Sequence, residues 1–220
     1  MAASTPGKPY IERAVNKNWP TITFFDMNGK CSALHFMLEH AGQNYNEDFV
    51  SFKTWAERKK DFQGNALPVV TLPDGMQLAE SIPQTTYFGK LHGYYPRDDL
   101  KAHKMELLID RVVDCIDTIG RAYFQKKPNQ MEEAIAKTVI FLDMIEPILA
   151  KSTFIMGDKL TVVDFWVASH LYCDKANEPL NPAYDLWKPV LAKYPNFKRY
   201  GEAYKKENAA WLMKRPKREF

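Results

Sequence analysis

The spacing of apolar residues changes once along this 220-residue chain, between Tyr94 and Asp98, and this change constrains the fold most strongly. Before it, short apolar runs of strand length alternate with segments whose apolar residues recur every three or four positions. After it, the apolar residues follow the helical spacing alone. We therefore predict a small α/β domain over residues 21–95 and an all-α domain over residues 98–220.

The first part of the chain predicts the order strand, helix, strand, irregular helix, strand, strand, helix. Pro73-Asp74-Gly75 lies between the last two apolar runs, and such a tripeptide strongly favours a hairpin turn. The predicted strands are Ile22–Phe25, Tyr45–Val50, Pro68–Leu72 and Met76–Leu78, and the predicted helices are Leu34–Ala41, Phe52–Phe62 and Ser81–His92.

The second part predicts long amphipathic helices. Apolar residues form one helical stripe over Met105–Ile119 and a second over Ile135–Leu149, where Pro147 is expected to end or kink the helix. A third helix is predicted to open at Thr161, whose side chain and that of Asp164 can form a capping box.

Composition and charge narrow the classes of function. A formal net charge of +3, with basic residues scattered except near the C-terminus, gives no reason to expect a nucleic-acid partner. The three cysteines fit neither a disulfide framework nor a zinc pattern, which favours a reducing compartment. No apolar run is long enough to span a membrane, and residues 1–20 read as an N-terminal extension without the apolar core of a signal peptide. We expect a cytoplasmic protein without a metal site.

Six short motifs, in this order, resemble those of one family. The sequence is similar to the cytosolic glutathione transferases, most closely to the sigma class, whose relatives include prostaglandin D synthases and lens S-crystallins. The resemblance extends from Pro20 to Phe220. It implies a thioredoxin-like N-terminal domain followed by an all-helical C-terminal glutathione-transferase domain. The motifs are FFDMNGK, WAERK, LPVV, ESIPQTTYF, FIMGDKLTVVDF and AWLMKRPKREF.

The resemblance implies that glutathione, as co-substrate, binds the first domain. Leu67 would pair its backbone with the cysteinyl unit, as an added strand does, provided that its peptide bond to Pro68 is cis. Ser81, at the predicted start of a helix, would receive the γ-glutamyl carboxylate, and Glu80 would accept a hydrogen bond from the ligand's ammonium group. An ordinary turn proline and a helix-capping serine are the alternatives.

Trp55 and Lys59 correspond to the tryptophan and lysine that the family directs at the glycyl carboxylate. An indole N–H and an ammonium group can both donate to that anion. Without the resemblance, Trp55 would be read as a packing residue and Lys59 as part of a solvated helix face.

The sequence departs from the family pattern where a tyrosine normally donates its hydroxyl to the glutathione sulfur. Phe24 occupies that position and Phe25 follows it, so neither offers a hydroxyl. Asn28 and Lys30 are the remaining candidates for favouring thiolate, and Cys31 could act as a redox thiol or pack as a small buried residue. The hydrogen bond from a tyrosine hydroxyl to the sulfur would contribute about 1.5–3 kcal/mol. Its absence predicts that glutathione is conjugated roughly ten- to hundredfold more slowly, while glutathione binding is largely kept.

Three functions stay open on this sequence. The first is a glutathione transferase that joins glutathione to a hydrophobic small-molecule electrophile held between the domains, in a homodimer of the family type. The second is a non-catalytic subunit of the same fold, built into a larger protein assembly through residues 1–20. The third is a glutathione-dependent isomerase. The family's acidic residue at the dimer contact would fall at Thr118, beside Asp117, which puts that contact in doubt.

Overall fold

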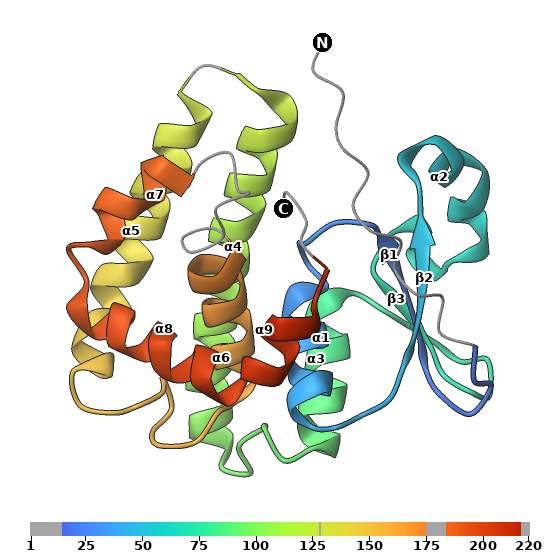
Figure 1. Ribbon diagram of the computed structural model, residues 1–220, viewed down its shortest axis with the longest axis horizontal. Coiled ribbons are helices and arrows are strands. Elements are labelled where there is room, and N and C mark those ends of the chain that lie inside the picture. The colour runs from blue at the N-terminus through green and yellow to red at the C-terminus, as the bar shows by residue number, and fades with distance from the viewer. Residues whose placement is uncertain (1–14, 128, 175–183, 217–220) are drawn as a thin grey trace.

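The computed structural model describes residues 15–127, 129–174 and 184–216. Its elements fall into two groups: a small sheet with helices beside it, and a larger bundle made of helices (Figure 1). The change of apolar spacing between Tyr94 and Asp98 coincides with the linker between α3 and α4. The exact domain limits, including the extension over residues 1–20, stay a prediction, because most of that extension lies outside the described residues.

The sheet has four strands in the order β2-β1-β3-β4. β1 (Thr21–Phe25) pairs in parallel with β2 (Asn46–Val50) and antiparallel with β3 (Val69–Thr71), which pairs antiparallel with β4 (Gln77–Ala79). The parallel pair is joined through a helix and the antiparallel pair through the predicted hairpin, as these two kinds of pairing require. This is the strand and helix order that the sequence predicts.

The helices of this first part lie on both sides of the sheet. α1 (Ser32–His40) and α3 (Ser81–Leu91) lie between the sheet and the helical bundle, where α1 also packs against α6 (Figure 1). α2 (Phe52–Arg58) is shorter than the predicted helix over Phe52–Phe62.

A 3₁₀ turn over Lys59–Asp61 forms the end of the predicted stretch, and a second one over Gln63–Asn65 follows it. α2 has no buried residue, so tertiary packing does not extend it, and Gly64 has a φ of 74°.

The helical part begins with the long pair α4 (Asp99–Gln125) and α5 (Gln130–Leu149). Pro147 lies inside α5 close to its end, so it neither stops the helix at once nor interrupts its middle. The remaining helices are α6 (Val162–Val167), the π-helical segment η3 (Ala168–Asp174), α7 (Tyr184–Leu191), α8 (Pro195–Glu207) and α9 (Ala209–Lys214).

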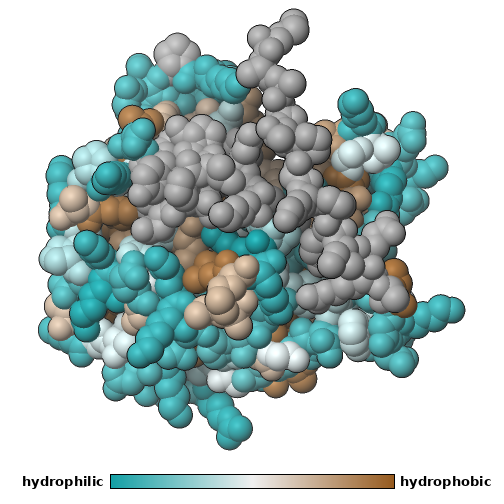
Figure 2. Space-filling view, in the orientation of Figure 1, coloured by the Kyte–Doolittle hydropathy of each residue, from teal (hydrophilic) through white to brown (hydrophobic). Residues whose placement is uncertain are grey.

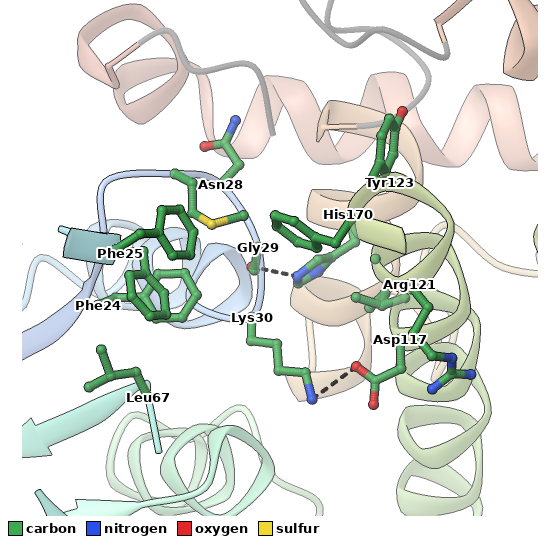
Figure 3. A pocket seen from close by; sticks show the side chains of 15 residues that line it. Phe24, Phe25, Asn28, Gly29, Lys30, Leu67, Asp117, Arg121, Tyr123 and His170 are labelled. Carbon is green, nitrogen blue, oxygen red and sulfur yellow. Dashed lines mark hydrogen bonds and ion pairs between the residues drawn. The ribbon is translucent and has the colours of Figure 1, made fainter. Parts of the chain in front are cut away.

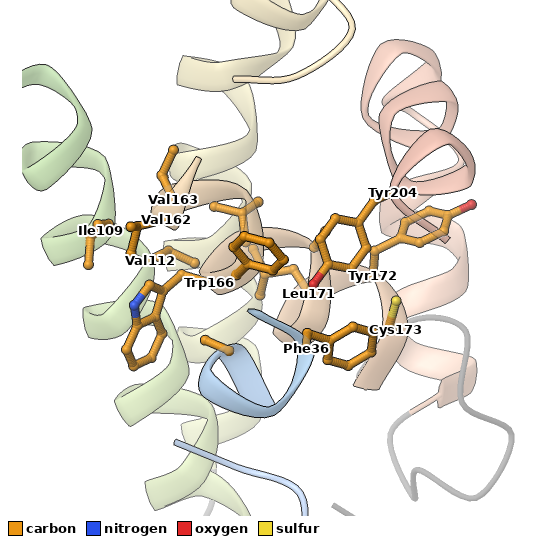
Figure 4. Close-up of a cluster of buried hydrophobic side chains, with 14 of the residues drawn as sticks. Phe36, Ile109, Val112, Val162, Val163, Trp166, Leu171, Tyr172, Cys173 and Tyr204 are labelled. Carbon is orange, nitrogen blue, oxygen red and sulfur yellow. The ribbon is translucent and has the colours of Figure 1, made fainter. Parts of the chain in front are cut away.

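α6 is the centre of the core, and all six of its residues are buried (Figure 4). The predicted capping box is present: the Thr161 backbone N–H donates to Oδ2 of Asp164 at 2.8 Å, and the Ile155 N–H donates to Oδ1 at 2.9 Å. These bonds satisfy a carboxyl group that is fully buried. Nε1 of Trp166 donates to the hydroxyl of Thr85 in α3 at 2.9 Å, which joins the two parts of the chain.

The face of the molecule in Figure 2 is mostly hydrophilic, with apolar side chains gathered in small patches. Within the part of the chain that the structure describes, no helix combines the length and the apolar character that crossing a membrane requires.

Candidate functional site

A cleft of about 380 Å³ lies between the turn that follows β1 and the helix α4 (Figure 3). Its wall is formed on one side by β1, the turn and Leu67, and on the other side by α4 and His170. Of the residues that the sequence singles out, this cleft brings together Phe24, Asn28, Lys30 and Leu67.

Phe24 lies near the end of β1 and turns its ring into this cleft with only 7% of the residue exposed. The ring lies against Gly29, because a Cβ added to that glycine would be 3.5 Å from Cε1 of Phe24. Gly29 has a φ of 150°, which side chains rarely permit, so glycine suits both the turn and the close ring. The ring supplies an apolar surface and no hydroxyl at this place.

Aromatic side chains continue the wall from the turn to α4. Phe25 stacks on Phe52 with a centroid distance of 4.4 Å, and Phe52 meets Phe124 of α4 edge to face at 6.4 Å. Phe52 and Phe124 keep 65% and 59% of their surface exposed. Large exposed apolar side chains that gather at a cleft mark a ligand or partner site, and these suit an apolar ligand.

Asn28 and Lys30, the two candidates for stabilising the glutathione thiolate, do not point toward the same place. Nζ of Lys30 lies 2.9 Å from Oδ1 of Asp117 in α4, so its positive charge is partly balanced. Asn28 points away from Lys30, toward the other edge of the cleft (Figure 3). Both members of the ion pair are partly exposed, so it contributes about 0–1 kcal/mol to stability, but it fixes where the Lys30 charge lies.

His170 is a site residue that the sequence does not reveal. It is fully buried in η3, and its Nε2 lies 2.8 Å from the carbonyl oxygen of Gly29. A carbonyl oxygen only accepts, so a hydrogen bond to Gly29 requires the proton on Nε2; Nδ1 lies 3.0 Å from the carbonyl oxygen of Trp166 and from the hydroxyl of Ser169. His170 and Gly29 are 141 positions apart, and a lone histidine in an apolar helix gives no signal of such a contact. His170 therefore fixes the turn from the helical part of the chain.

Replacing His170 with phenylalanine tests this support. Phenylalanine keeps a ring stacked on Trp166, whose ring centroid lies 5.2 Å away, but removes the contacts of the imidazole nitrogens with the carbonyl oxygens of Gly29 and Trp166. The Gly29 carbonyl still accepts from the Ser32 N–H at 2.8 Å. We expect the free energy of unfolding, measured with urea, to fall by about 1–3 kcal/mol. His170→Gln, which keeps a side-chain donor, is the control and is expected to lose less. If the phenylalanine variant were as stable as the unchanged protein, His170 would not stabilise the turn at Gly29.

The peptide bond between Leu67 and Pro68 is cis, as binding of a cysteinyl unit requires on the sequence interpretation. Gln84 holds this loop: its Nε2 donates to the carbonyl oxygens of Pro68 at 2.8 Å and Leu78 at 2.7 Å. Among the residues that the structure describes, none forms a hydrogen bond with the backbone of Leu67. That backbone is therefore available for pairing with an extended ligand at the cleft.

Ser81 is the first residue of α3 and is buried, and Glu80 before it is exposed. Glu80 has φ 65° and ψ 122°, a conformation that residues other than glycine rarely adopt. Such backbone strain costs of order 1–3 kcal/mol and is found most often at functional sites. This conformation of Glu80 is consistent with a functional site here and does not depend on the cleft.

Trp55 and Lys59 lie outside the wall of the cleft. Trp55 packs against Phe62 with a centroid distance of 6.2 Å and meets Phe25 edge to face at 5.7 Å. Lys59 follows the end of α2 and is exposed. The ring of Trp55 therefore packs against neighbouring aromatic side chains, and Lys59 lies near it as an exposed cation; neither observation tests their assignment to the glycyl carboxylate.

The cysteines are poor candidates for chemistry. Cys31 is only 1% exposed at the start of α1, so its thiol is out of reach of a ligand in solution. Burial raises the pKa of Cys115 to about 11 and also raises the pKa of Cys173, which disfavours thiolate at both.

Two carboxylates of α4 form ion pairs. Asp114 pairs with Lys137 of α5 at 2.6 Å, as Asp117 pairs with Lys30. Across the described ranges, no cluster of three or more histidine, cysteine, aspartate or glutamate side chains could hold a metal ion.

Comparisons with known proteins agree with this architecture. Residues 108–206 match the family described as "Glutathione S-transferase, C-terminal domain". The class-mu 28 kDa glutathione S-transferase isozyme of Schistosoma mansoni is 26% identical, over 89% of this chain and 95% of that protein. S-crystallin 4 of Enteroctopus dofleini is 21% identical, over 91% and 98% of the two chains.

Solved structures show the same fold over nearly the whole chain. Prostaglandin synthase D of Nilaparvata lugens superposes with a TM-score of 0.76 at 20% identity, covering 90% of this chain and 99% of that one. Monomeric Na-GST-3, a glutathione S-transferase of Necator americanus, gives 0.77 at 20% identity, covering 92% and 100%.

The fold is therefore a thioredoxin-like domain followed by an all-helical glutathione-transferase domain. The family match over residues 108–206 and the similar relatives along the chain support a member of the cytosolic glutathione transferase family.

Proposed function

We propose that this protein is a sigma-like glutathione transferase that joins glutathione to a hydrophobic electrophile held in the cleft between the β1–α1 turn and α4. The observation that carries the proposal is this aromatic cleft, which opens beside Phe24 and Leu67 at the junction of the two domains. Similarity to the family supports a glutathione-dependent reaction, and the relatives named glutathione S-transferases favour an enzyme over a non-catalytic subunit of a larger assembly. The enzyme acts in the cytoplasm as a homodimer.

The middle and the γ-glutamyl end of glutathione have partners on the first domain. The cysteinyl unit pairs with the backbone of Leu67 beside Pro68, and its sulfur then lies toward Phe24. The γ-glutamyl carboxylate binds Ser81 and the free N–H groups at the start of α3, a helix of 11 residues. Glu80 accepts from the ammonium group of the ligand.

The glycyl end binds the outer side of the same domain. Lys59 supplies a positive charge, and the indole N–H of Trp55 supplies a donor. Lys59 is exposed, so its attraction to the carboxylate is screened by solvent and weaker than the contact at Ser81.

The sulfur meets a site that favours thiolate only weakly. Phe24 offers no hydroxyl, Asn28 points toward the far edge of the cleft, and the charge of Lys30 is partly balanced by Asp117. A free thiol is still a few per cent thiolate at neutral pH. The proposed enzyme is therefore slow in conjugation but able to bind glutathione.

The proposal is tested by isothermal titration with glutathione, together with a conjugation assay using chlorodinitrobenzene. Saturable glutathione binding with a slow conjugation rate above the uncatalysed rate is the expected result. A protein that binds no glutathione, both as it stands and with tyrosine at position 24, would exclude the enzyme. Glutathione binding without any conjugation in either form would leave the non-catalytic subunit and the glutathione-dependent isomerase.

Ser81→Ala tests the proposed contact with the γ-glutamyl carboxylate separately from the rest of the site. A hydrogen bond to a charged group contributes about 1.5–3 kcal/mol. Its removal is therefore expected to weaken glutathione binding roughly ten- to hundredfold. Isothermal titration measures the dissociation constant. Ser152→Ala is the matched control, since Ser152 bonds to the carbonyl oxygens of Ile148 and Phe154, away from the proposed site. Equal glutathione affinity of the two variants would remove Ser81 from the binding site.

A further inference from the structure

The α-helices of the described chain contain three glycines, one each in α3, α4 and α8: Gly89, Gly120 and Gly201. Glycine inside a helix is about 1 kcal/mol less favourable than alanine, because it loses more backbone freedom on folding. A glycine at such a position therefore calls for a compensating reason in packing or in function.

Packing explains two of the three. A Cβ added to Gly89 would lie 2.3 Å from Cγ2 of Val162, so α3 and α6 can approach each other only without it. A Cβ added to Gly201 would lie 2.3 Å from Cδ2 of Tyr172, inside the space that this ring fills. Any side chain at either position would force neighbouring helices apart.

Gly120 has no such explanation. A Cβ at this position would meet no atom of the described residues within 4 Å. The empty space belongs to the cleft, since Gly120 lies in its wall together with Ile116 and Phe124. These neighbours are one helical turn before and after it on the same face of α4. The missing side chain therefore leaves a notch between two apolar residues.

We propose that Gly120 determines which electrophiles the cleft admits, by leaving a notch for apolar ligands broader than one aromatic ring. The stacked pair of Phe25 and Phe52 offers a flat aromatic surface, and Phe124 meets Phe52 edge to face. Fused aromatic rings suit such a wall because their faces stack and their edges meet other rings favourably. A side chain at position 120 would occupy the space into which the second ring extends.

This inference rests on the proposed function, and glutathione thioethers separate the two. A thioether has no thiol to activate, so its binding does not require the hydroxyl that Phe24 lacks. S-methylglutathione tests the tripeptide site alone, and S-(naphthylmethyl)glutathione adds a fused-ring group that must enter the cleft. Isothermal titration gives both dissociation constants for the unchanged protein, Gly120→Ala and Gly120→Leu. Thermal unfolding of each variant shows whether it is folded.

Gly120→Leu is expected to keep its affinity for S-methylglutathione and to bind the naphthylmethyl thioether at least about tenfold more weakly. Gly120→Ala is expected to fall between the other two proteins in affinity for the naphthylmethyl compound, and to unfold at a higher temperature than the unchanged protein. An unchanged ratio of the two affinities in Gly120→Leu would overturn the role of Gly120. Failure of the unchanged protein to bind either thioether would overturn the proposed function itself, and this inference with it.

Discussion

Replacing Phe24 with tyrosine is expected to raise the rate of glutathione conjugation about ten- to thirtyfold at neutral pH, because a thiol that is already a few per cent ionised cannot gain more thiolate than this. The new hydroxyl would donate to the thiolate and stabilise it by roughly 1.5–3 kcal/mol, which lowers the pKa of the bound thiol by about one to two units. Cζ, where the hydroxyl attaches, would be 3.6 Å from a Cβ on Gly29, and the absence of that Cβ gives the group room. A pH profile of kcat/KM for the electrophile, taken at saturating glutathione, measures the shift of the pKa of the bound thiol.

Phe25→Tyr is the matched control for this experiment. It adds the same hydroxyl one residue later, on a ring that stacks against Phe52. We expect its conjugation rate and pH profile to follow the unchanged protein. If both tyrosine variants gained activity equally, the position of the hydroxyl would not matter and Phe24 would lose its assigned place beside the sulfur. If Phe24→Tyr bound glutathione with an unshifted thiol pKa, the same conclusion would follow.

Replacing Gly201 with alanine is expected to destabilise the protein by about 3 kcal/mol or more, at the upper end of the cost of overpacking a core. Tyr172 cannot yield easily: its ring is buried and packs against Phe197 at 5.8 Å, and its hydroxyl donates to Glu202 at 2.6 Å. For a chain of this size, such a loss lowers the unfolding temperature by roughly 6–12 °C. Thermal unfolding followed by circular dichroism measures the change.

Gly120→Ala is expected to have the opposite effect in thermal unfolding, namely to stabilise the protein. Both substitutions add one methyl group inside an α-helix and gain about 1 kcal/mol in helix propensity. They differ in what the methyl group meets, which is an anchored ring at position 201 and open space at position 120. Destabilisation of both variants to the same extent would show that the space beside Gly120 is not open, and a stable Gly201→Ala would show that Tyr172 moves freely.

Local signals in the sequence were sufficient to predict much of the fold. The hairpin at Pro73-Asp74-Gly75 and the capping box of Thr161 and Asp164 depend on residues within one turn, and the structure confirms both. The order of strands and helices followed from the spacing of apolar residues, which the sheet and α4 reproduce. The irregular helical stretch predicted over Phe52–Phe62 is present as α2 followed by a 3₁₀ turn over Lys59–Asp61, so its extent could be predicted from the sequence but not the change of helix type.

The candidate site could be predicted only in part. The turn residues and Leu67 follow one another in motifs, so the resemblance identified them, and they do line one cleft. The contacts that complete the cleft join distant segments: Lys30 with Asp117, and Gly29 with His170. The spacing of apolar residues predicts where the helices that carry Asp117 and His170 lie in the sequence. It does not predict which of their side chains face the turn. Which ligand groups the site residues contact is still a prediction.

The turn after β1 is secured from outside its own domain. His170 holds the carbonyl of Gly29, and Asp117 holds the ammonium group of Lys30. In the proposed complex with glutathione, the surroundings of the sulfur therefore lie between the two halves of the chain, whereas Glu80 and Ser81 belong to one half. A change deep in the helical half, far from the proposed ligand, is then expected to alter the reactivity of the sulfur while the tripeptide stays bound.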